Sequence, residues 1–383
     1  MTTADGSAGT VSVSGDGWAP FVHGAASLEP GDGGGVTPHR LPAWARAQVA
    51  DPMFLAVEAC PGGVALRFDT DADEAVLTIG TTTMVPAGAA TPVIAPLVVS
   101  RGGRDVDVPA PIPTVIEFSP QLQPAGIRPH APQAITLPIP GTGPVTVLLP
   151  HNARVSLVSL TAAAPLRPAE MPGLRWTHYG SSISQGLNAV SAARTWPVAA
   201  ARTLGWNLRN LSFSGNAQLD GFAARMIRDI PADLITLKIG INLLNADSMR
   251  ERTFRPAVHA FLDTIREGQP DTPIALITAL ACPLHEHTPG PVVGDPDGMM
   301  RAAQRDVEQD AGALTLHRTR EILGEVAQVR ADPRLALVDG LALFGEADAG
   351  HLYDRLHPDQ AGLDLIADRF VALVGARYDE AAR

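Results

Sequence analysis

From residue 173 onward, the sequence alternates short apolar runs with longer amphipathic segments, and this alternation constrains the fold more than any other feature. A run of four to seven apolar residues suits a buried strand, whereas the segments between the runs are long enough for helices. Repeated strand-helix-strand units predict a parallel sheet of about five strands with helices on both faces. The expected strands are 176–179, 208–211, 234–239, 274–280 and 336–338, and the expected helices are 195–203, 221–228, 254–267, 299–310, 316–330 and 358–378.

The part of the chain before residue 165 has a different pattern, in which short runs rich in β-branched residues recur between turn-forming residues. Such spacing predicts an antiparallel β-sandwich of jelly-roll type. The expected strands are 64–68, 75–79, 114–118, 146–149 and 155–160. The sequence Asp-Thr-Asp-Ala-Asp at 69–73 has the residues of an Asx turn and predicts a hairpin connection between the first two of these strands.

Three prolines between Pro165 and Pro172 disfavour a helix and remove donors from a strand, so we place the domain boundary there. The small polar residues at the start of the chain predict a frayed segment. The predicted organisation is a flexible N-terminus at 1–17, a β-sandwich domain at 18–165, a linker at 166–172 and an α/β domain at 173–383.

Charge and composition narrow the classes of partner. The formal net charge of −11 offers no basic surface to a phosphate backbone, so we expect no nucleic-acid partner. No apolar run reaches 18 residues and no secretory signal is visible, which favours a cytoplasmic protein without a membrane partner. Cys60 and Cys282 form no disulfide framework. We attribute the presence of a single lysine, Lys238, to codon bias, and the oligomeric state stays open.

Two segments could carry nucleophilic chemistry. Ser182 lies in the glycine-bounded loop 179–186 after an expected strand, where ligands bind in open α/β folds. Asp354 precedes His357 by three residues in one loop, so the carboxylate could reach the imidazole while the other ring nitrogen faces the serine. The alternatives are an ordinary loop of small residues and a helix-capping segment.

Gly215 and Asn242 each follow a strand of the same expected sheet. With the N–H of Ser182, the Gly215 amide and the Asn242 side chain could donate hydrogen bonds to an oxyanion, although either residue could simply form a turn. Residues 282–287 contain thiol, imidazole and carboxylate groups but lack two separated ligand pairs, so we expect no metal site there. His178 and Trp196 are interpreted as core residues.

The order of these blocks resembles the GDSL/SGNH hydrolase family, over roughly residues 174 to 378. The resemblance implies a flavodoxin-like domain in which Ser182 is the nucleophile, Gly215 and Asn242 are oxyanion donors, and Asp354 and His357 complete the triad. It requires no cofactor and no metal. Two positions depart from the family pattern, since Ser181 and Leu243 stand where aspartate is usual, and these departures bear on loop anchoring and acyl preference.

A β-sandwich before such a domain is similar to the architecture of some carbohydrate esterases. The resemblance therefore implies a serine esterase that hydrolyses a short-chain acyl ester of a sugar or other polar alcohol through an acyl-enzyme. An acyltransferase with the same triad is an alternative. A catalytically inactive binding protein is another, and the identities of the acyl group and of the alcohol stay open.

Overall fold

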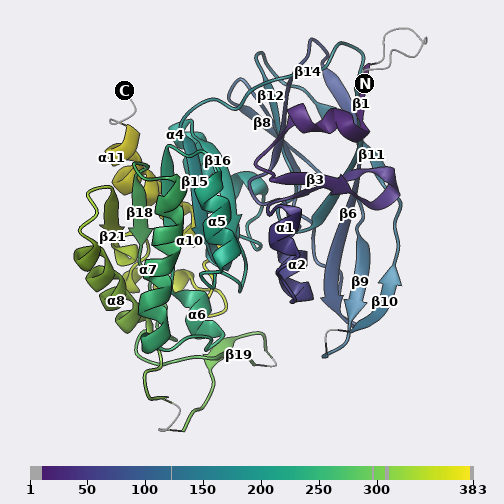
Figure 1. Cartoon of the computed structure of the whole chain (residues 1–383). Coiled ribbons are helices and arrows are strands. Elements are labelled where there is room, and N and C mark those ends of the chain that lie inside the picture. Colours follow the sequence, from purple (N-terminus) through teal and green to yellow (C-terminus); the bar gives the residue numbers. More distant parts are fainter. Residues whose placement is uncertain (1–10, 122, 296, 307–309, 380–383) are drawn as a thin grey trace. The chain divides into compact units, whose positions relative to one another are not determined.

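The computed structural model describes residues 11–121, 123–295, 297–306 and 310–379, and the chain divides into two compact units. The first unit comprises Met1–Pro172 together with Ala189–Ala193, and the second comprises Gly173–Asn188 together with Arg194–Arg383. Strands dominate the first unit, whereas the second alternates strands and helices (Figure 1).

Two sheets make up the first unit. The larger has the order β10-β9-β6-β13-β4-β3, with β1 paired to β13 and β11 paired to β6. The smaller has the order β14-β5-β12-β7-β8, with β2 paired to β5. The strands of the larger sheet are β1 (Val11–Ser14), β3 (Ser27–Pro30), β4 (Val36–His39), β6 (Glu74–Pro86), β9 (Thr114–Phe118), β10 (Pro124–Arg128), β11 (Gln133–Pro138) and β13 (Arg154–Ala162). Those of the smaller are β2 (Val22–His23), β5 (Ala65–Asp69), β7 (Leu97–Arg101), β8 (Arg104–Val108), β12 (Val145–Leu148) and β14 (Arg167–Pro168).

Every second residue of the facing strands enters one shared core, as the pleat of a strand requires. Leu66 and Phe68 from β5 are buried in this core together with Leu77 and Ile79 from β6. The predicted β-sandwich is therefore confirmed, with the qualification that β6 and β9 pair in parallel rather than antiparallel. Short helices complete the unit: η1 (Gly15–Phe21), η2 (Asp32–Gly34), α1 (Ala43–Arg46) and α2 (Pro52–Glu58).

Three local expectations for this unit differ from the structure. Segment 69–73 is not a hairpin, because β5 belongs to the smaller sheet and β6 to the larger, so the turn carries the chain from one sheet to the other. Residues 11–14 of the segment expected to be frayed form β1, while residues 1–10 lie outside the described residues. Within the expected linker, Arg167 and Pro168 form β14, which pairs with β5.

A buried polar cluster ties α2 to the end of β4. Arg40 is fully buried, and its guanidinium donates hydrogen bonds to the carbonyl oxygens of Glu58 and Val57. The Glu58 carboxylate, also fully buried, accepts hydrogen bonds from the Leu41 amide and contacts Nδ1 of His39 at 2.8 Å. Burial lowers the pKa of Arg40 to about 10, and the Glu58 charge opposes that fall.

We expect Glu58→Ala to destabilise the chain by about 3–5 kcal/mol, because the substitution removes the carboxylate charge that favours the buried Arg40 cation and leaves the Leu41 amide without its acceptor. Urea unfolding followed by circular dichroism measures this loss. The exposed Glu74, replaced in the same way, serves as the control. Equal unfolding midpoints for the two variants would contradict the structural role given to Glu58.

The second unit is built on a five-stranded parallel sheet with the order β16-β15-β17-β18-β21. Its strands are β15 (Arg175–Gly180), β16 (Asn207–Ser212), β17 (Leu234–Lys238), β18 (Ile274–Ile277) and β21 (Leu335–Val338). The helices are α3 (Ser182–Gln185), η3 (Ala192–Arg194), α4 (Trp196–Leu204), α5 (Gly221–Asp229), α6 (Ile241–Asn245), α7 (Glu251–Gly268), α8 (Leu316–Arg330), α9 (Gly340–Leu343), η5 (Glu346–His351), α10 (Gln360–Phe370), η6 (Val371–Gly375) and α11 (Ala376–Asp379).

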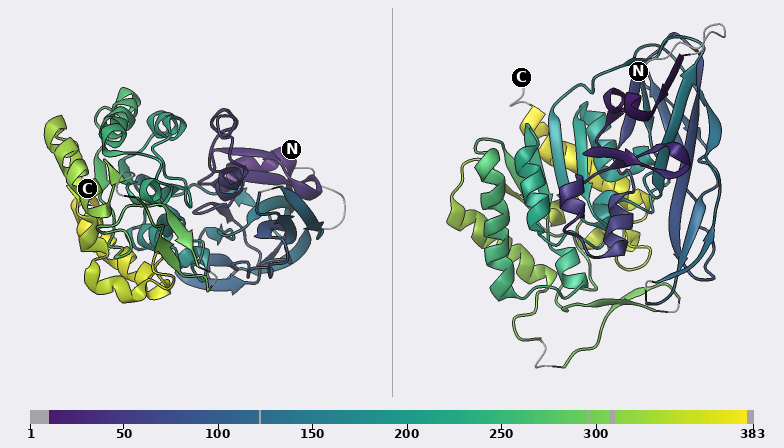
Figure 2. Two further views of the ribbon diagram at one scale, coloured as in Figure 1. Left: turned by 90° about the horizontal axis from the view of Figure 1, so that it is seen from below. Right: turned by 45° about the vertical axis from the view of Figure 1, so that its right-hand side comes forward.

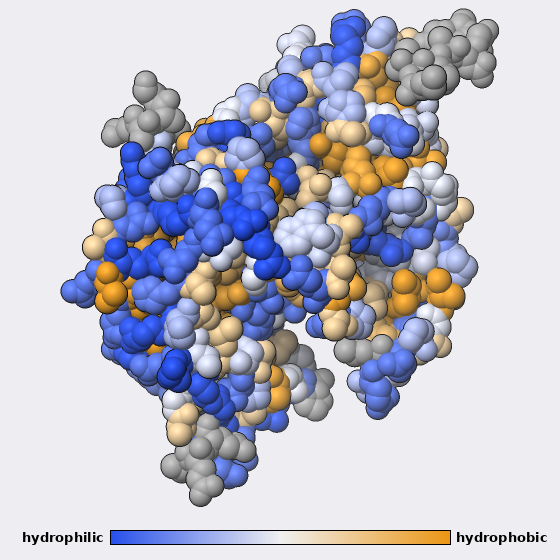
Figure 3. Space-filling view, viewed as in Figure 1, coloured by the Kyte–Doolittle hydropathy of each residue, from blue (hydrophilic) through white to orange (hydrophobic). Residues whose placement is uncertain are grey.

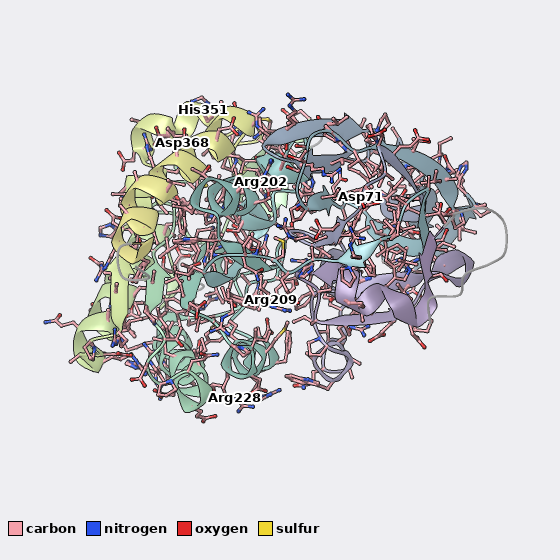
Figure 4. The ribbon with its side chains drawn as sticks, turned by 90° about the horizontal axis from the view of Figure 1, so that it is seen from above. Asp71, Arg202, Arg209, Arg228, His351 and Asp368 are labelled. Atoms are coloured by element: carbon pink, nitrogen blue, oxygen red, sulfur yellow. The ribbon has the colours of Figure 1, made fainter. Side chains whose placement is uncertain are left out.

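Helices cover both faces of this sheet (Figure 2). Contacts join α5 to α7 and α7 to α8 on one face, and α4 to α10 on the other. Arg228 on α5 and Asp368 on α10 accordingly lie on opposite outer sides of the unit (Figure 4). The outer surface over α5 and α7 is predominantly hydrophilic, while α7 buries residues such as Phe254 and Phe261 (Figure 3). The predicted doubly covered α/β fold is confirmed.

One expected helix of the second unit is absent among the described residues, and one strand and one further helix differ in extent. Segment 299–310 contains the short strand β20 (Met300–Ala302), which pairs with β19 (Val292–Gly294), and residues 307–309 lie outside the described part. Strand β18 ends at Ile277, three residues earlier than expected. The C-terminal helix is divided into α10, the π-helical turn η6 and α11. None of the described helices combines the length and apolar character needed to span a membrane.

Candidate active site

Ser182 lies at the carboxyl edge of the sheet because β15 ends at Gly180 and α3 begins two residues later. A Cβ atom at Gly180 would come within 2.8 Å of His178 Nε2 and 2.7 Å of Ser184 Oγ, so this turn requires glycine. The helix is a single turn that ends at Gly186 with a left-handed φ of 68°. This turn was not foreseen from the sequence, and it makes Ser182 the first residue of a helix.

A continuous chain of hydrogen bonds joins Ser182 to His357 and Asp354. Nε2 of His357 lies 3.0 Å from Oγ of Ser182, and Nδ1 lies 2.7 Å from Oδ2 of Asp354. All three side chains are at least partly buried, with side-chain exposures of 21% for His357 and 8% for Asp354. The spacing expected from the sequence therefore brings the two residues together in the loop before α10.

Backbone N–H groups of its own loop fix the orientation of the Asp354 carboxylate. Oδ1 accepts the backbone N–H groups of Leu356 and His357, at 2.9 and 2.6 Å. Burial alone would raise the pKa of Asp354, but the His357 ring and these two amides outweigh it, and the pKa lies below its usual value. A carboxylate held ionised in this way orients the imidazole and favours its positively charged form.

Asn242 presents an unpaired donor near the same edge. Its Oδ1 accepts the N–H of Ala217 at 3.0 Å, which fixes the orientation of the amide. Its Nδ2 is buried and has no hydrogen-bond partner among the described residues. A buried donor without an acceptor costs free energy unless a ligand supplies one. Asn242 is therefore suited to donate to a bound oxygen.

Gly215 lies in the loop that contacts Asn242. The N–H of Ser214 donates to Oε1 of Gln185 at 2.8 Å, and this bond ties the loop to α3. Gly215 has a φ of 73°, and a Cβ atom there would meet nothing within 4 Å, so the space beside this backbone is open. The loop that contains Gly215 is therefore bonded to the helix of Ser182 through Gln185 and to Asn242 through Ala217. Sequence reasoning did not identify Gln185, since a single glutamine carries no recognisable pattern.

A buried polar cluster lies beneath α3, on the sheet face that packs against α4. Oγ1 of Thr236 accepts the indole N–H of Trp176 at 2.8 Å and lies 2.6 Å from Nδ1 of His178. Burial, with a smaller effect of the nearby Lys238 charge, lowers the pKa of His178 well below its usual value. His178 is a neutral core histidine, as predicted from the sequence, and it packs on Trp196 with ring centroids 4.9 Å apart.

Lys238 ends β17 and belongs to the same cluster. The residue is 4% exposed, and its Nζ lies 3.2 Å from Oγ of Ser181, the residue before the nucleophile candidate. Burial lowers the pKa of this amine to about 7. The sequence interpretation assigned Lys238 no part in the site. Its position four residues before Asn242, at the end of an apolar strand, was the signal that could have identified it.

Segment 282–287 does not assemble a metal site. The Cys282 thiol donates to the Arg355 carbonyl, and the Glu286 carboxylate is occupied by an ion pair with Arg320. Within the described ranges of the chain, no group of three or more His, Cys, Asp or Glu side chains is arranged to hold a metal ion.

A small cavity is lined by Ile183 and Leu356, which adjoin Ser182 and His357 in the chain, together with Ile241 and Lys238. Its volume is about 10 Å³, enough for roughly one water molecule or methyl group. The lining is mostly apolar, so the cavity suits a small apolar group.

Solved structures that resemble this chain cover nearly its whole length, including residues of both units. A salicylyl-acyltransferase, SsfX3, from a tetracycline biosynthetic pathway is 26% identical with a TM-score of 0.78, over 96% of this chain and 97% of that one. A Bacteroides ovatus protein described as a GDSL-like lipase is 19% identical with a TM-score of 0.63, over 96% and 97% of the two chains. A family 2 carbohydrate esterase from Cellvibrio japonicus is 13% identical with a TM-score of 0.55, over 97% and 98%. A search of curated proteins finds no match.

The two likenesses below 25% identity show a common fold and no more. The family comparison is more specific, since residues 178–365 match the model of the GDSL-like lipase/acylhydrolase family. This stretch contains all five residues singled out from the sequence and the hydrogen bonds that join three of them. The α/β unit of this chain belongs to the GDSL-like lipase/acylhydrolase family.

Proposed function

We propose that the protein is a serine ester hydrolase that acts on a small-molecule ester through an acyl-enzyme at Ser182. The observation that carries this proposal is the hydrogen-bonded series from Ser182 Oγ through the His357 ring to the Asp354 carboxylate. A serine hydroxyl is a weak nucleophile unless a neighbouring base removes its proton. The two distances are those of such an activated serine.

The reaction would proceed in two steps, acylation of Ser182 and hydrolysis of the acyl-enzyme. Ser182 Oγ attacks the ester carbonyl carbon while its proton moves to Nε2 of His357, and the negative charge collects on the former carbonyl oxygen. When the intermediate collapses, the carbon–oxygen bond to the alcohol breaks and His357 returns the proton to the leaving alcohol. A water molecule then loses a proton to His357 and attacks the acyl-enzyme, which releases the acid and restores Ser182.

The oxyanion would be stabilised by three donors. The N–H of Ser182 is at the first position of a helix, where no intrahelical acceptor exists. The unpartnered Nδ2 of Asn242 and the N–H of Gly215 complete the set. Donors fixed before the reaction stabilise the transition state without reorganising. Asp354 keeps the imidazole in the tautomer that presents Nε2 to the serine.

The cavity lined by Ile183 and Leu356, the chain neighbours of Ser182 and His357, supports a short acyl group, because its volume fits a methyl group and its lining is mostly apolar. For the alcohol we propose a sugar or another polar alcohol, the class suggested by the names of the carbohydrate esterases that share this fold. Comparing acetylated sugars with acetylated aliphatic alcohols at equal concentration tests this part of the proposal.

We expect kcat/KM to fall at least about tenfold from p-nitrophenyl acetate to the octanoate, because additional methylenes exceed the cavity and must lie in solvent or displace its walls. A chain-length series measured by nitrophenolate release gives the ratio. Ile241→Ala, which enlarges the cavity, should shift the preference toward longer chains. A wild type that prefers octanoate would contradict the short-acyl assignment.

Acyl transfer to an alcohol or amine other than water is the second candidate, because the full-length structural match at 26% identity is an acyltransferase. Both reactions share the acyl-enzyme and differ in what attacks it. Product analysis by mass spectrometry, with sugar and amine acceptors added to the ester, distinguishes them. Transfer that exceeds hydrolysis in 55 M water, at about millimolar acceptor, would establish the transferase and overturn the hydrolase.

A further inference from the structure

Lys238 contacts one of the three chain segments that carry the proposed oxyanion donors and directly precedes another. Its Nζ contacts Oγ of Ser181, which directly precedes Ser182, and its own strand continues through Gly240 to Asn242. In the register of the sheet Tyr179 pairs with Leu237, so Lys238 lies level with Gly180. The amine is therefore held beneath the turn that presents the nucleophile.

The surroundings of this amine contain no bonded carboxylate. Within the described part of the chain, Ser181 Oγ is the hydrogen-bond partner recorded for Nζ. Burial is the cause of the lowered pKa, and no acidic group offsets it. An ammonium group in such a place lacks two of the three acceptors that it could use. A negatively charged oxygen that develops nearby would supply a missing hydrogen-bond acceptor.

The titratable groups on the elements around Lys238 do not provide this charge. Burial lowers the pKa of His178 on β15 and raises that of the Cys282 thiol to about 11, so both are uncharged near neutral pH. In the loop before α10, the Asp354 carboxylate bonds to His357 and to the Leu356 amide. The only new anion expected close to Lys238 is the one that forms on the substrate.

We propose that Lys238, as an ammonium ion, is a positioning residue that holds the Ser181 hydroxyl and favours the tetrahedral anion on Ser182. This inference rests on the proposed function and extends it. The cation acts at short range in a site that excludes water, where a charge has more effect than it has in solvent. Linkage requires reciprocity: if the charged amine stabilises the anion, the anion must stabilise the charged amine.

Because the chain has a single lysine, NMR can measure this reciprocity without resonance assignment. A chain labelled with [ε-¹³C]lysine gives one Cε signal, whose position reports protonation of Nζ as pH is varied. We expect the midpoint near pH 7 in the free enzyme, in accord with the lowered pKa of Lys238. Methylboronic acid forms a bond from boron to Ser182 Oγ, the serine proton passes to His357, and the boron becomes tetrahedral and anionic. The adduct thus has the same charges as the reaction intermediate.

In the boronate adduct we expect the Lys238 midpoint to rise by about one pH unit, equivalent to about tenfold tighter boronate binding when the amine is charged. The tetrahedral boron is detected independently by ¹¹B NMR, and Ser182→Ala is the control that forms no adduct. If the wild type forms no adduct, both the proposed function and this inference fail. If the adduct forms and the midpoint stays or falls, the proposed function stands and this inference is overturned.

Variants separate a role in the reaction from a role in stability. The unfolded chain keeps Lys238 protonated up to about pH 10.5, whereas the folded chain keeps it protonated only up to about pH 7. Below pH 7 the buried ammonium therefore lowers the free energy of unfolding by its full amount. This destabilisation decreases as the pH rises from about 7 to about 10.5. Lys238→Met should therefore raise Tm at pH 7 by about 5–10 °C while it lowers kcat about tenfold with little change in KM.

Ser181→Ala is the matched control, because it removes the hydrogen bond and keeps the charge. We expect it to lose less activity than Lys238→Met and to retain the upward shift of the Cε midpoint. A Lys238→Met enzyme with unchanged kcat would overturn the inference. So would equal losses of kcat in both variants, since the hydrogen bond alone would then account for the effect.

Discussion

The Ser182→Ala enzyme is expected to hydrolyse p-nitrophenyl acetate at least about 10⁴-fold more slowly than the wild type. The Ser182 hydroxyl accepts or donates the bond to His357 Nε2 at 3.0 Å, and no other described group offers that imidazole a nucleophilic oxygen. Its loss removes the covalent route entirely and leaves only binding and the oxyanion donors. Initial rates across a range of enzyme concentrations measure the ratio.

His357→Ala should lose nearly as much activity, and the double variant little more, because members of one proton-transfer unit do not act additively. Asp354→Asn should retain more activity than either. Labelling with a fluorophosphonate followed by peptide mass spectrometry identifies the modified serine. A label on Ser181 or Ser184, or a Ser182→Ala enzyme with a normal rate, would show that the nucleophile has been misassigned.

Asn242→Ala should lower kcat by about 10²–10³, or about 2.7–4 kcal/mol of transition-state stabilisation, and change KM far less. Nδ2 of Asn242 is buried and unpartnered among the described residues, so its hydrogen bond is gained only when an oxygen binds. An oxygen that carries more charge in the transition state than in the ester gains more from this donor.

The Asn242 prediction needs a control because Oδ1 also orders the loop through Ala217. Asn242→Asp keeps this acceptor and replaces the donor by an anion, so it should be as slow as Asn242→Ala while keeping the wild-type Tm more closely. Asn207→Ala, at the opposite edge of the sheet, should leave kcat unchanged. If KM rises and kcat does not fall, Asn242 binds the ester in its ground state instead of stabilising the oxyanion.

The α/β unit was predictable from sequence to within a few residues at most strand and helix ends. Helix α8 begins and ends at the expected residues, because a capping threonine precedes it and an apolar stripe runs along it. The candidate site was predictable for the same reason: Ser182, Asn242 and the Asp354–His357 pair each follow an apolar strand or precede an amphipathic helix. Their roles remain predictions.

What the sequence did not reveal depends on contacts between distant segments. The turn at 69–73 has hairpin chemistry, yet the strand after it, β6, pairs with β13 and β11 rather than with β5. Segment 299–310 has helix-forming residues but pairs as β20 with β19. The Lys238–Ser181 hydrogen bond joins residues 57 positions apart, and no local pattern encodes such a bond.

The single lysine also determines how this protein reacts with amine-directed reagents. Lys238 is 4% exposed, so amine-directed reagents such as activated esters and aldehydes find no accessible lysine, and the cationic side chains presented to solvent are guanidinium and imidazole groups. Amine-directed coupling should therefore leave the amine beneath Ser182 unmodified.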